Sequence, residues 1–333
     1  MKRIILIGLL FLSIILMTGV YNLAQTLFVS TIHFKYEKDK YQITLFCPSS
    51  FSVGKTDSTP DDSATILSVG GNTISQAFNN AENSSEIEIN YRHIVSVIFD
   101  ESFLKEEYIK EFNDFIIENK RIDFNFYIFS SKTDSKEIFS FKNPEKISSF
   151  YSILNVSAKS DYLFKYCKPL HYVDFLRGVN KKRYSLKIPY LDIKKDYTIE
   201  DEESSNIYLS SMLVYQDKIM NIYSSEEDKE LTYLNEFEYG RLYLSEENCV
   251  IQKISYKIKH NEELKVIISC DYETLIEVSE TKLKKHILDN AKLAYKKLRE
   301  SKIDFYNIND INEKYNKSYS LDDIAFEVKL KKI

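Results

Sequence analysis

Residues 94–128 carry the strongest folding signal in the chain. The nearly continuous apolar run over 94–99 is typical of a strand that is covered on both faces. Apolar side chains then recur every three to four residues over about 102–119, which predicts an amphipathic helix. Alternating apolar residues over 122–128 indicate a second strand. Because a strand, a helix and a strand follow one another at this spacing, we expect two parallel strands joined by a right-handed crossover, a βαβ unit.

The N-terminus predicts the compartment. Lys2 and Arg3 precede an apolar stretch over residues 4–20, which is long for a signal peptide and short for a membrane span. Both interpretations, a signal peptide and a membrane span, predict that the rest of the chain lies outside the cytoplasm. The residues just before Val20 resemble the start of a lipobox, the tetrapeptide that ends in a lipid-bearing cysteine, but Val20 has no thiol. We therefore expect residues 1–24 to form an uncleaved, lipoprotein-like anchor.

Three domains are expected after the anchor. Residues 25–178 form an α/β domain that opens with a hairpin, has a polar loop over 48–65 and contains the βαβ unit. Residues 179–246 form an acidic, β-rich middle domain, since 190–248 has 5 basic and 15 acidic side chains. Residues 247–333 combine paired strands, a long helix and a final strand. The predicted fold class is α+β: three small mixed α/β domains with largely antiparallel sheets, after an N-terminal hydrophobic anchor.

Composition excludes several classes of function. The chain has 7 glycines in 333 residues and contains no Walker loop, dinucleotide fingerprint, nucleophile elbow or His-Glu-x-x-His helix. A formal charge of −5 argues against broad nucleic-acid binding. The four widely spaced cysteines match no zinc ribbon; a Cys249–Cys270 disulfide is geometrically possible, and free thiols are favoured. The sequence therefore predicts no catalytic, cofactor-binding or metal-binding residue.

One group of residues nevertheless has the chemistry of a thiol site. Cys167, His171 and Asp174 would share a face of a continuous helix, where they could bind a metal or activate the sulfur. Pro169 interrupts that helix, so structural roles are favoured for all three. His33, in an expected strand, is likewise interpreted as a structural histidine.

A row of lysines in the last domain is the candidate interaction surface. Lys253, Lys257 and Lys259 lie on the polar side of an expected strand, and Lys329 and Lys331 would join them if the final strand lies nearby. The face is either an ordinary solvated one or a docking surface for an acidic partner or anionic headgroups. In the second case each lysine in contact contributes about 1 kcal/mol.

Three sequence stretches resemble a known family. Residues 69–78 read Val-Gly-Gly-Asn-Thr-Ile-Ser-Gln-Ala-Phe, residues 93–101 form a His-containing apolar strand that ends in Asp-Glu, and residues 213–220 form a hairpin with Asp-Lys at its turn. In this order they resemble the C subunit of the nutrient germinant receptors of endospore-forming bacteria, the Ger(x)C family. The likeness extends over residues 26–333 by the order of elements. The chain departs from the family in having Val20 in place of the lipid-modified cysteine, and in having no Trp.

The resemblance implies a non-enzymatic subunit that is needed for the germination response to nutrients. Such a subunit would assemble with two integral-membrane partners, the A-type and B-type subunits, at the spore inner membrane, with the bulk of the chain on its outer face. No catalytic, cofactor-binding or ligand-binding residue comes with the resemblance. Two alternatives remain: a tethered extracytoplasmic solute-binding protein, which would have two similar α/β lobes, and a cell-envelope thiol enzyme that uses Cys167 and His171.

Overall fold

A computed structural model gives the fold of the protein. It describes residues 26–48, 64–140, 167–181, 184–197, 203–217, 219–224, 227–237, 242–244, 249–260, 262–274, 278–322 and 324–333. The expected anchor at 1–24, most of the expected loop at 48–65 and a helix expected near 144–156 lie outside these residues. No helix in the described part of the chain is both long and apolar enough to cross a membrane.

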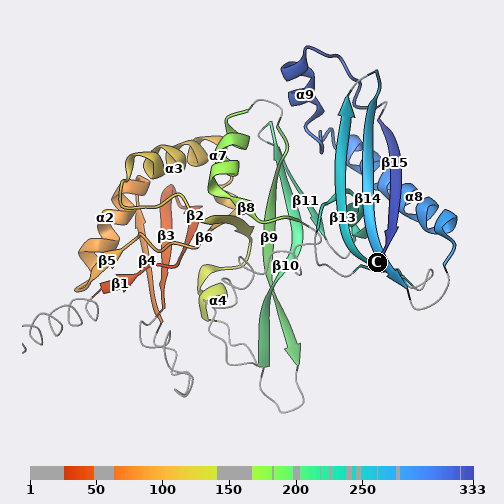
Figure 1. Cartoon of the computed structure of the whole chain (residues 1–333). Coiled ribbons are helices and arrows are strands. Elements are labelled where there is room, and N and C mark those ends of the chain that lie inside the picture. Colours follow the sequence, from red (N-terminus) through yellow and green to blue (C-terminus); the bar gives the residue numbers. More distant parts are fainter. Residues whose placement is uncertain are drawn as a thin grey trace, which may run out of the picture.

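The described strands form three sheets (Figure 1). The large sheet has the order β11-β10-β9-β7-β6-β2-β3-β4, with β8 paired to β7. Its strands are β2 (Thr31–Glu37), β3 (Lys40–Cys47), β4 (Thr65–Gly71), β6 (Ser96–Asp100), β7 (Tyr127–Ser131), β8 (Leu170–His171), β9 (Leu186–Tyr197), β10 (Glu203–Gln216) and β11 (Ile219–Ser224). The C-terminal sheet contains β12 (Leu242–Leu244), β13 (Cys249–His260), β14 (Leu264–Thr274) and β15 (Ala325–Lys332), and the third pairs β1 (Thr26–Phe28) with β5 (Glu88–Asn90).

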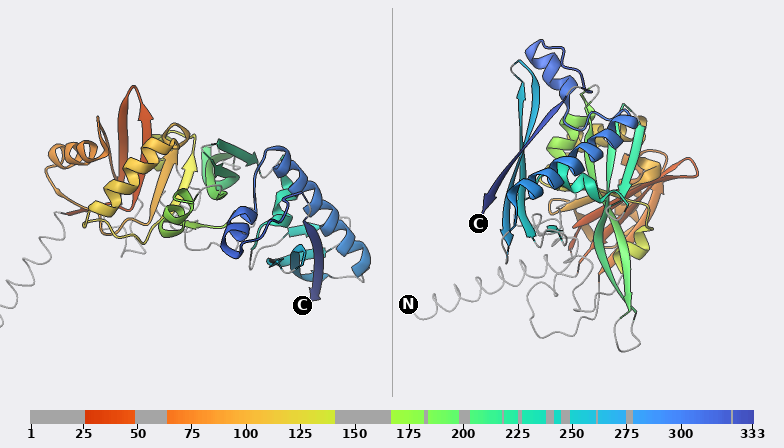
Figure 2. Two further views of the ribbon diagram at one scale, coloured as in Figure 1. Left: turned by 90° about the horizontal axis from the view of Figure 1, so that it is seen from above. Right: turned by 90° about the vertical axis from the view of Figure 1, so that its right-hand side faces the viewer.

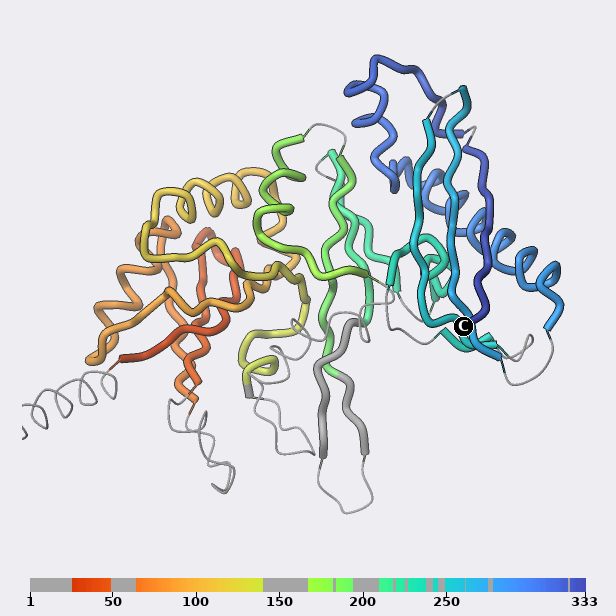
Figure 3. Tube along the Cα trace, in the orientation of Figure 1, coloured from red at the N-terminus to blue at the C-terminus, as the bar shows by residue number. Residues whose placement is uncertain are grey.

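Helices cover the large sheet and the C-terminal sheet. The α-helices are α2 (Ile74–Ser84), α3 (Glu106–Glu118), α4 (Ser135–Ser140), α7 (Tyr172–Val179), α8 (Glu280–Glu300) and α9 (Ile308–Tyr315), and the short 3-10 helices are η1 (Glu101–Phe103) and η2 (Lys229–Leu234). Figure 3 follows the chain from the N-terminal strands at one end of the molecule to the C-terminal sheet at the other. The fold class predicted from the sequence, α+β with largely antiparallel sheets, is confirmed.

The predicted βαβ unit is present. Strand β6 pairs with β7 in parallel, Ser96 lies opposite Tyr127, and α3 connects the two strands. The buried side chains of α3 include Phe112 and Ile116, which pack into the same core as α2 and α7. The spacing of apolar residues therefore predicted both the elements and their pairing.

Aromatic rings fill the core of the large sheet. Phe34, fully buried on β2, lies at the centre of this cluster. Its ring centroid is between 5.1 and 6.3 Å from those of Phe78, Phe99, Phe103 and Phe112. These rings come from α2, β6, η1 and α3. The side chain of Phe34 therefore packs between the strands of the sheet and the helices that cover them.

The start of α2 explains part of the 69–78 stretch. Thr73 caps the helix, because its Oγ1 accepts a hydrogen bond from the Gln76 backbone N–H at 3.1 Å, as the sequence predicted. The Gln76 side chain in turn accepts one from the Asn72 N–H at 2.7 Å. A Cβ atom on Gly71 would lie 2.5 Å from the backbone nitrogen of Ala77. Only glycine fits at this position, because a larger residue would push α2 away from β4.

Strand β10 belongs to two cores. Leu213 and Tyr215 pack into the core of the large sheet, whereas Met212 and Val214 pack into the C-terminal core. Side chains alternate along a strand, so β10 faces one core on each side. The domain division at residue 178 stays a prediction; the strands on its two sides share the large sheet, in which Ser130 of β7 pairs with Tyr190 of β9.

The C-terminal module has a sheet with α8 on one face (Figure 2). The expected strand pair β13 and β14 is antiparallel. Helix α8 buries the apolar stripe that its spacing predicted, which consists of Leu283, Ile287, Ala291, Ala294 and Leu298. The last strand, β15, pairs with β14 in parallel. This is possible because α8 and α9, which lie between the two strands in the chain, return it to the end of the sheet at which β14 begins.

Candidate interaction surface

The ladder of the C-terminal sheet places the five predicted lysines on one face. Residues directly opposite each other in paired strands share a face. Lys253 of β13 lies opposite Asp271 of β14, which lies opposite Lys331 of β15. Lys329, Lys257 and Lys259 follow at alternate positions of the same strands and so lie on the same side. We call this side, which is opposite to the core, the lysine face.

Strand β14 separates the two groups of predicted lysines and adds one more. Lys265 of β14 lies opposite Lys259 on the lysine face. Its Nζ is 2.9 Å from an Oε1 of Glu263, and this hydrogen bond raises the pKa of Lys265. Lys265 was not among the predicted lysines, because apolar residues dominate β14, although the polar residues that alternate with them could have revealed it.

Carboxylates on the lysine face partly neutralise it. Glu327 lies 3.7 Å from Lys329 and 4.0 Å from Lys265, measured between charged atoms. Asp271 lies between Lys253 and Lys331 in the ladder. Exposed ion pairs of this kind contribute little to stability. Among the described residues of this face, lysines therefore outnumber carboxylates.

The alternative thiol site of Cys167, His171 and Asp174 is not assembled in the described structure. Cys167 is buried in the C-terminal core, and burial raises the pKa of its thiol to about 12. The ring of His171 instead lies 4.4 Å from that of Tyr127, and Asp174 pairs with Arg177 at 3.2 Å. Among the described contacts, no hydrogen bond or ion pair joins Cys167, His171 and Asp174. Because a thiolate is the reactive form, this buried thiol is a poor nucleophile at neutral pH.

The remaining thiols follow the favoured prediction. Cys47, Cys249 and Cys270 are also buried, and none of the three forms a disulfide bond among the described residues. In the β13–β14 ladder Cys249 lies opposite Thr274, whereas Cys270 lies opposite Ile254, so the two sulfurs are not cross-strand neighbours. Within the described residues, no group of three or more His, Cys, Asp or Glu side chains is arranged to hold a metal ion.

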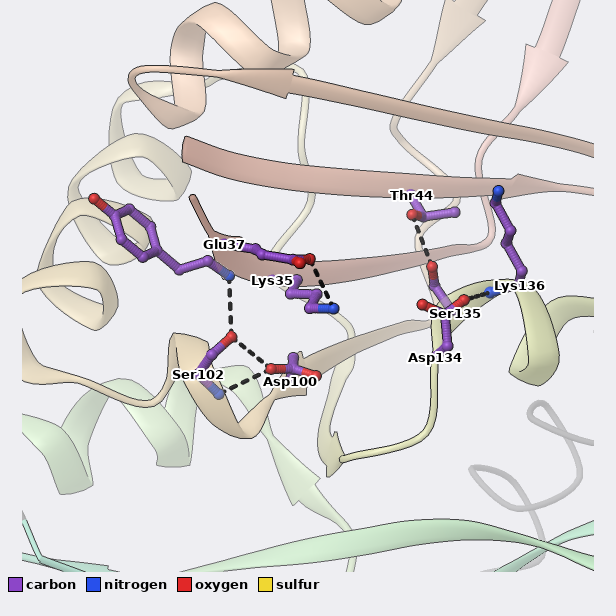
Figure 4. Close-up of polar contacts among 9 residues, drawn as sticks. Lys35, Glu37, Thr44, Asp100, Ser102, Asp134, Ser135 and Lys136 are labelled. Atoms are coloured by element: carbon purple, nitrogen blue, oxygen red, sulfur yellow. Dashed lines mark hydrogen bonds and ion pairs between the residues drawn. The ribbon is translucent and has the colours of Figure 1, made fainter. Parts of the chain in front are cut away.

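A second polar region lies on the face of the large sheet near α4 (Figure 4). The Thr44 hydroxyl is 3.0 Å from that of Ser135, and the backbone N–H of Ser102 donates to Asp100 at 2.9 Å. His33 of β2 lies opposite Thr44 in the β2–β3 ladder and is only 1 % exposed.

His33 is buried, as a structural histidine should be, but its Nε2 has no hydrogen-bond partner among the described residues. Burial lowers the pKa of His33 to about 4, although the carboxylates of Asp100 and Asp134 act in the opposite direction. The imidazole is therefore neutral at neutral pH. Its protonation would place a charge inside the sheet.

The fold and this surface define a mixed α/β protein with a lysine-rich sheet face. A family model described as the spore germination protein N-terminal domain matches residues 20–193, just over half of the chain. The chain belongs to this spore germination protein family, and the resemblance noted in the sequence is confirmed. Among solved structures, the crystal structure of the GerBC protein is similar at 12 % identity and a TM-score of 0.45, covering 91 % of this chain and 96 % of that chain. No curated protein matches the chain.

Proposed function

We propose that the chain is the C-type subunit of a nutrient germinant receptor, tethered to the spore inner membrane with its bulk on the outer face. The observation that carries this proposal is the family match over residues 20–193. The subunit acts by binding its A-type and B-type membrane partners and catalyses no reaction. The buried, protonated thiol of Cys167 agrees with a role that needs no nucleophile.

The tether is the apolar N-terminal stretch over residues 4–20. A spanning helix holds a protein at the membrane more firmly than acyl chains do, so the missing lipobox cysteine does not prevent attachment. Fractionation of the wild type beside a Val20→Cys variant tests this step. We expect both in the membrane fraction; wild-type protein in the soluble fraction would eliminate the peptide anchor.

The lysine face docks on an acidic surface of a membrane partner. The distribution of charge also supports assembly, since residues 190–248 are acidic and residues 249–333 carry more basic than acidic side chains. The two alternative functions have less support. The large sheet and the four-stranded C-terminal sheet differ in the number and order of their strands. A solute-binding protein would instead have two similar lobes.

A charge-reversal variant tests the docking role. Lys253, Lys257 and Lys259 are changed together to Glu in a strain that lacks the wild-type gene. The loss of three contacts of about 1 kcal/mol each weakens docking by roughly 100-fold, so we expect loss of copurification with the membrane partners and loss of nutrient germination. Folding, measured by thermal unfolding, should be unchanged because the three side chains lie on a polar sheet face.

The matched control is the triple change of Lys282, Lys285 and Lys292 to Glu. These side chains are exposed on α8, on the other side of the C-terminal sheet, and the net charge changes equally. The control should retain germination. Equal behaviour of the two triple variants would remove the docking role, and loss of binding to anionic vesicles alone would assign the face to lipid headgroups instead of a partner.

A further inference from the structure

A polar cavity lies where the N-terminal part of the large sheet meets β9, β10 and β11. Its volume is about 380 Å³, within the range of small-molecule sites. Glu101, which follows β6, and Lys132, which follows β7, line it together with Tyr190 of β9 and Ile222 of β11. The carboxyl ends of parallel strands are where α/β sheets commonly bind ligands.

A β-bulge shapes the wall of this cavity. Tyr190 of β9 pairs with Ser211 of β10, but the next residue, Leu191, pairs with Leu209, so Ser210 is an extra residue. In a regular strand, Ser210 and Ser211 would face opposite sides of the sheet. Both line the cavity here. Bulges that redirect a side chain are frequent next to binding and active sites.

The hydroxyl of Ser210 is unpaired among the described residues. Ser210 is 9 % exposed, and its Oγ forms no hydrogen bond within the described part of the chain. Buried polar atoms in folded proteins are nearly always paired, so an unpaired one in a cavity wall needs an explanation. A ligand that hydrogen-bonds to this hydroxyl would supply the missing partner.

The carboxylates of the cavity are held in place. The Tyr190 hydroxyl donates a hydrogen bond to Glu101, and burial together with this carboxylate raises the pKa of Tyr190, so it remains a donor. Asp192 accepts a hydrogen bond from the Thr133 hydroxyl at 3.3 Å. Asp228 accepts one from the Ser224 N–H at 2.8 Å. Glu101 follows β6, Asp192 belongs to β9 and Asp228 follows β11. The negative charges of the cavity therefore come from three separate parts of the sheet.

The charges select the ligand class. Glu101, Asp192, Asp228 and Glu227 line the cavity together with a single lysine, Lys132. Lys297 of α8 pairs with Asp228 from outside the lining, which still leaves an excess of carboxylates. Spread negative charge attracts a ligand with cationic groups several ångströms apart, and each ammonium group can also donate to a hydroxyl.

We propose that this cavity binds a small linear organic diamine or polyamine. One ammonium group binds between Glu101 and Asp192 and donates a hydrogen bond to the Ser210 hydroxyl. A second ammonium group binds at Glu227 and Asp228, which follow β11. The proposal does not depend on the receptor assignment, because it rests on the cavity alone.

Isothermal titration of the purified full-length protein with 1,4-diaminobutane at low salt tests the proposal. We expect saturable binding, about fivefold weaker binding in Ser210→Ala and about tenfold weaker binding in Glu101→Gln. Ser210→Ala should not lower the melting temperature of the free protein, since the hydroxyl that is removed forms no hydrogen bond within the described residues. The neutral isostere 1,4-butanediol should not compete, and Ser255→Ala, on the lysine face, should bind like the wild type.

Two results would overturn the proposal. One is the absence of saturable heat with the wild type up to about 10 mM diamine, a concentration that detects even millimolar affinity. The other is binding that neither Ser210→Ala nor Glu101→Gln weakens, because the diamine would then be held elsewhere on the acidic surface.

Discussion

Acid should destabilise the protein through His33. The imidazole is 1 % exposed within the large sheet, and burial keeps its pKa near 4, against 6.5 for an ordinary histidine. Between these two values the unfolded chain binds a proton at this position and the folded chain does not. The contribution of His33 to stability is therefore fully present above pH 6.5 and is lost as the pH falls from 6.5 through 4.

The size of the loss follows from the two pKa values. At pH 5 His33 is protonated almost completely in the unfolded state but only in about a tenth of the folded molecules. This difference lowers the free energy of unfolding by about 2 kcal/mol. Below pH 4 the loss approaches about 3.4 kcal/mol, since one pKa unit corresponds to about 1.36 kcal/mol. This is a large part of the stability of a typical domain.

Urea unfolding at several pH values measures this loss. We compare the wild type with His33→Gln, which keeps a polar side chain but cannot titrate, and with His93→Gln as an exposed control. Wild type and His33→Gln carry the same titratable groups apart from His33, so the difference between these two proteins isolates His33. Between pH 7.5 and 5 the free energy of unfolding of the wild type should fall by about 2 kcal/mol more than that of His33→Gln. The same pH dependence in both proteins would refute the reasoning.

Three further predictions concern packing and thiol chemistry. Gly71→Ala should lower stability by about 2–4 kcal/mol, because the new Cβ would lie 2.5 Å from the Ala77 nitrogen. Gly70→Ala, whose nearest contact is 3.5 Å, should cost much less, and equal melting temperatures would contradict this. Phe34→Ala should cost about 3–5 kcal/mol in chemical unfolding, and a cost below about 1 kcal/mol would mean that the aromatic cluster is not central. Cys167 should resist iodoacetamide in the native protein at pH 7.5 and react after unfolding, as mass spectrometry of its peptide can show; rapid native labelling would mean that the thiol is accessible.

Local signals in the sequence were sufficient for the elements whose partners lie close by in the chain. The βαβ unit is an example, because its two strands and its helix are consecutive and each has its own period. The stripe of α8 and the cap at Thr73 depend on spacings of three or four residues within one helix. The lysine face was only partly predicted: the alternation in β13 was visible, but the position of β15 depended on an unknown pairing.

Long-range pairing accounts for what the sequence did not predict. The attachment of β9 to β7 rests on a contact between Ser130 and Tyr190, which no local pattern marks. The bulge at Ser210 depends on the register between β9 and β10, because the same residues in a regular strand would leave the serine on the other side of the sheet. The cavity that it lines was therefore invisible in the sequence.

The two-sided strand β10 has a mechanical consequence. Leu213 and Tyr215 are fixed among side chains of the first core, and Met212 and Val214, their immediate neighbours, among those of the second. A tilt or slide of this strand displaces both sets at once, because one backbone carries them. The packing of the two cores is thus coupled through this strand, and a rearrangement of one core at β10 requires a rearrangement of the other.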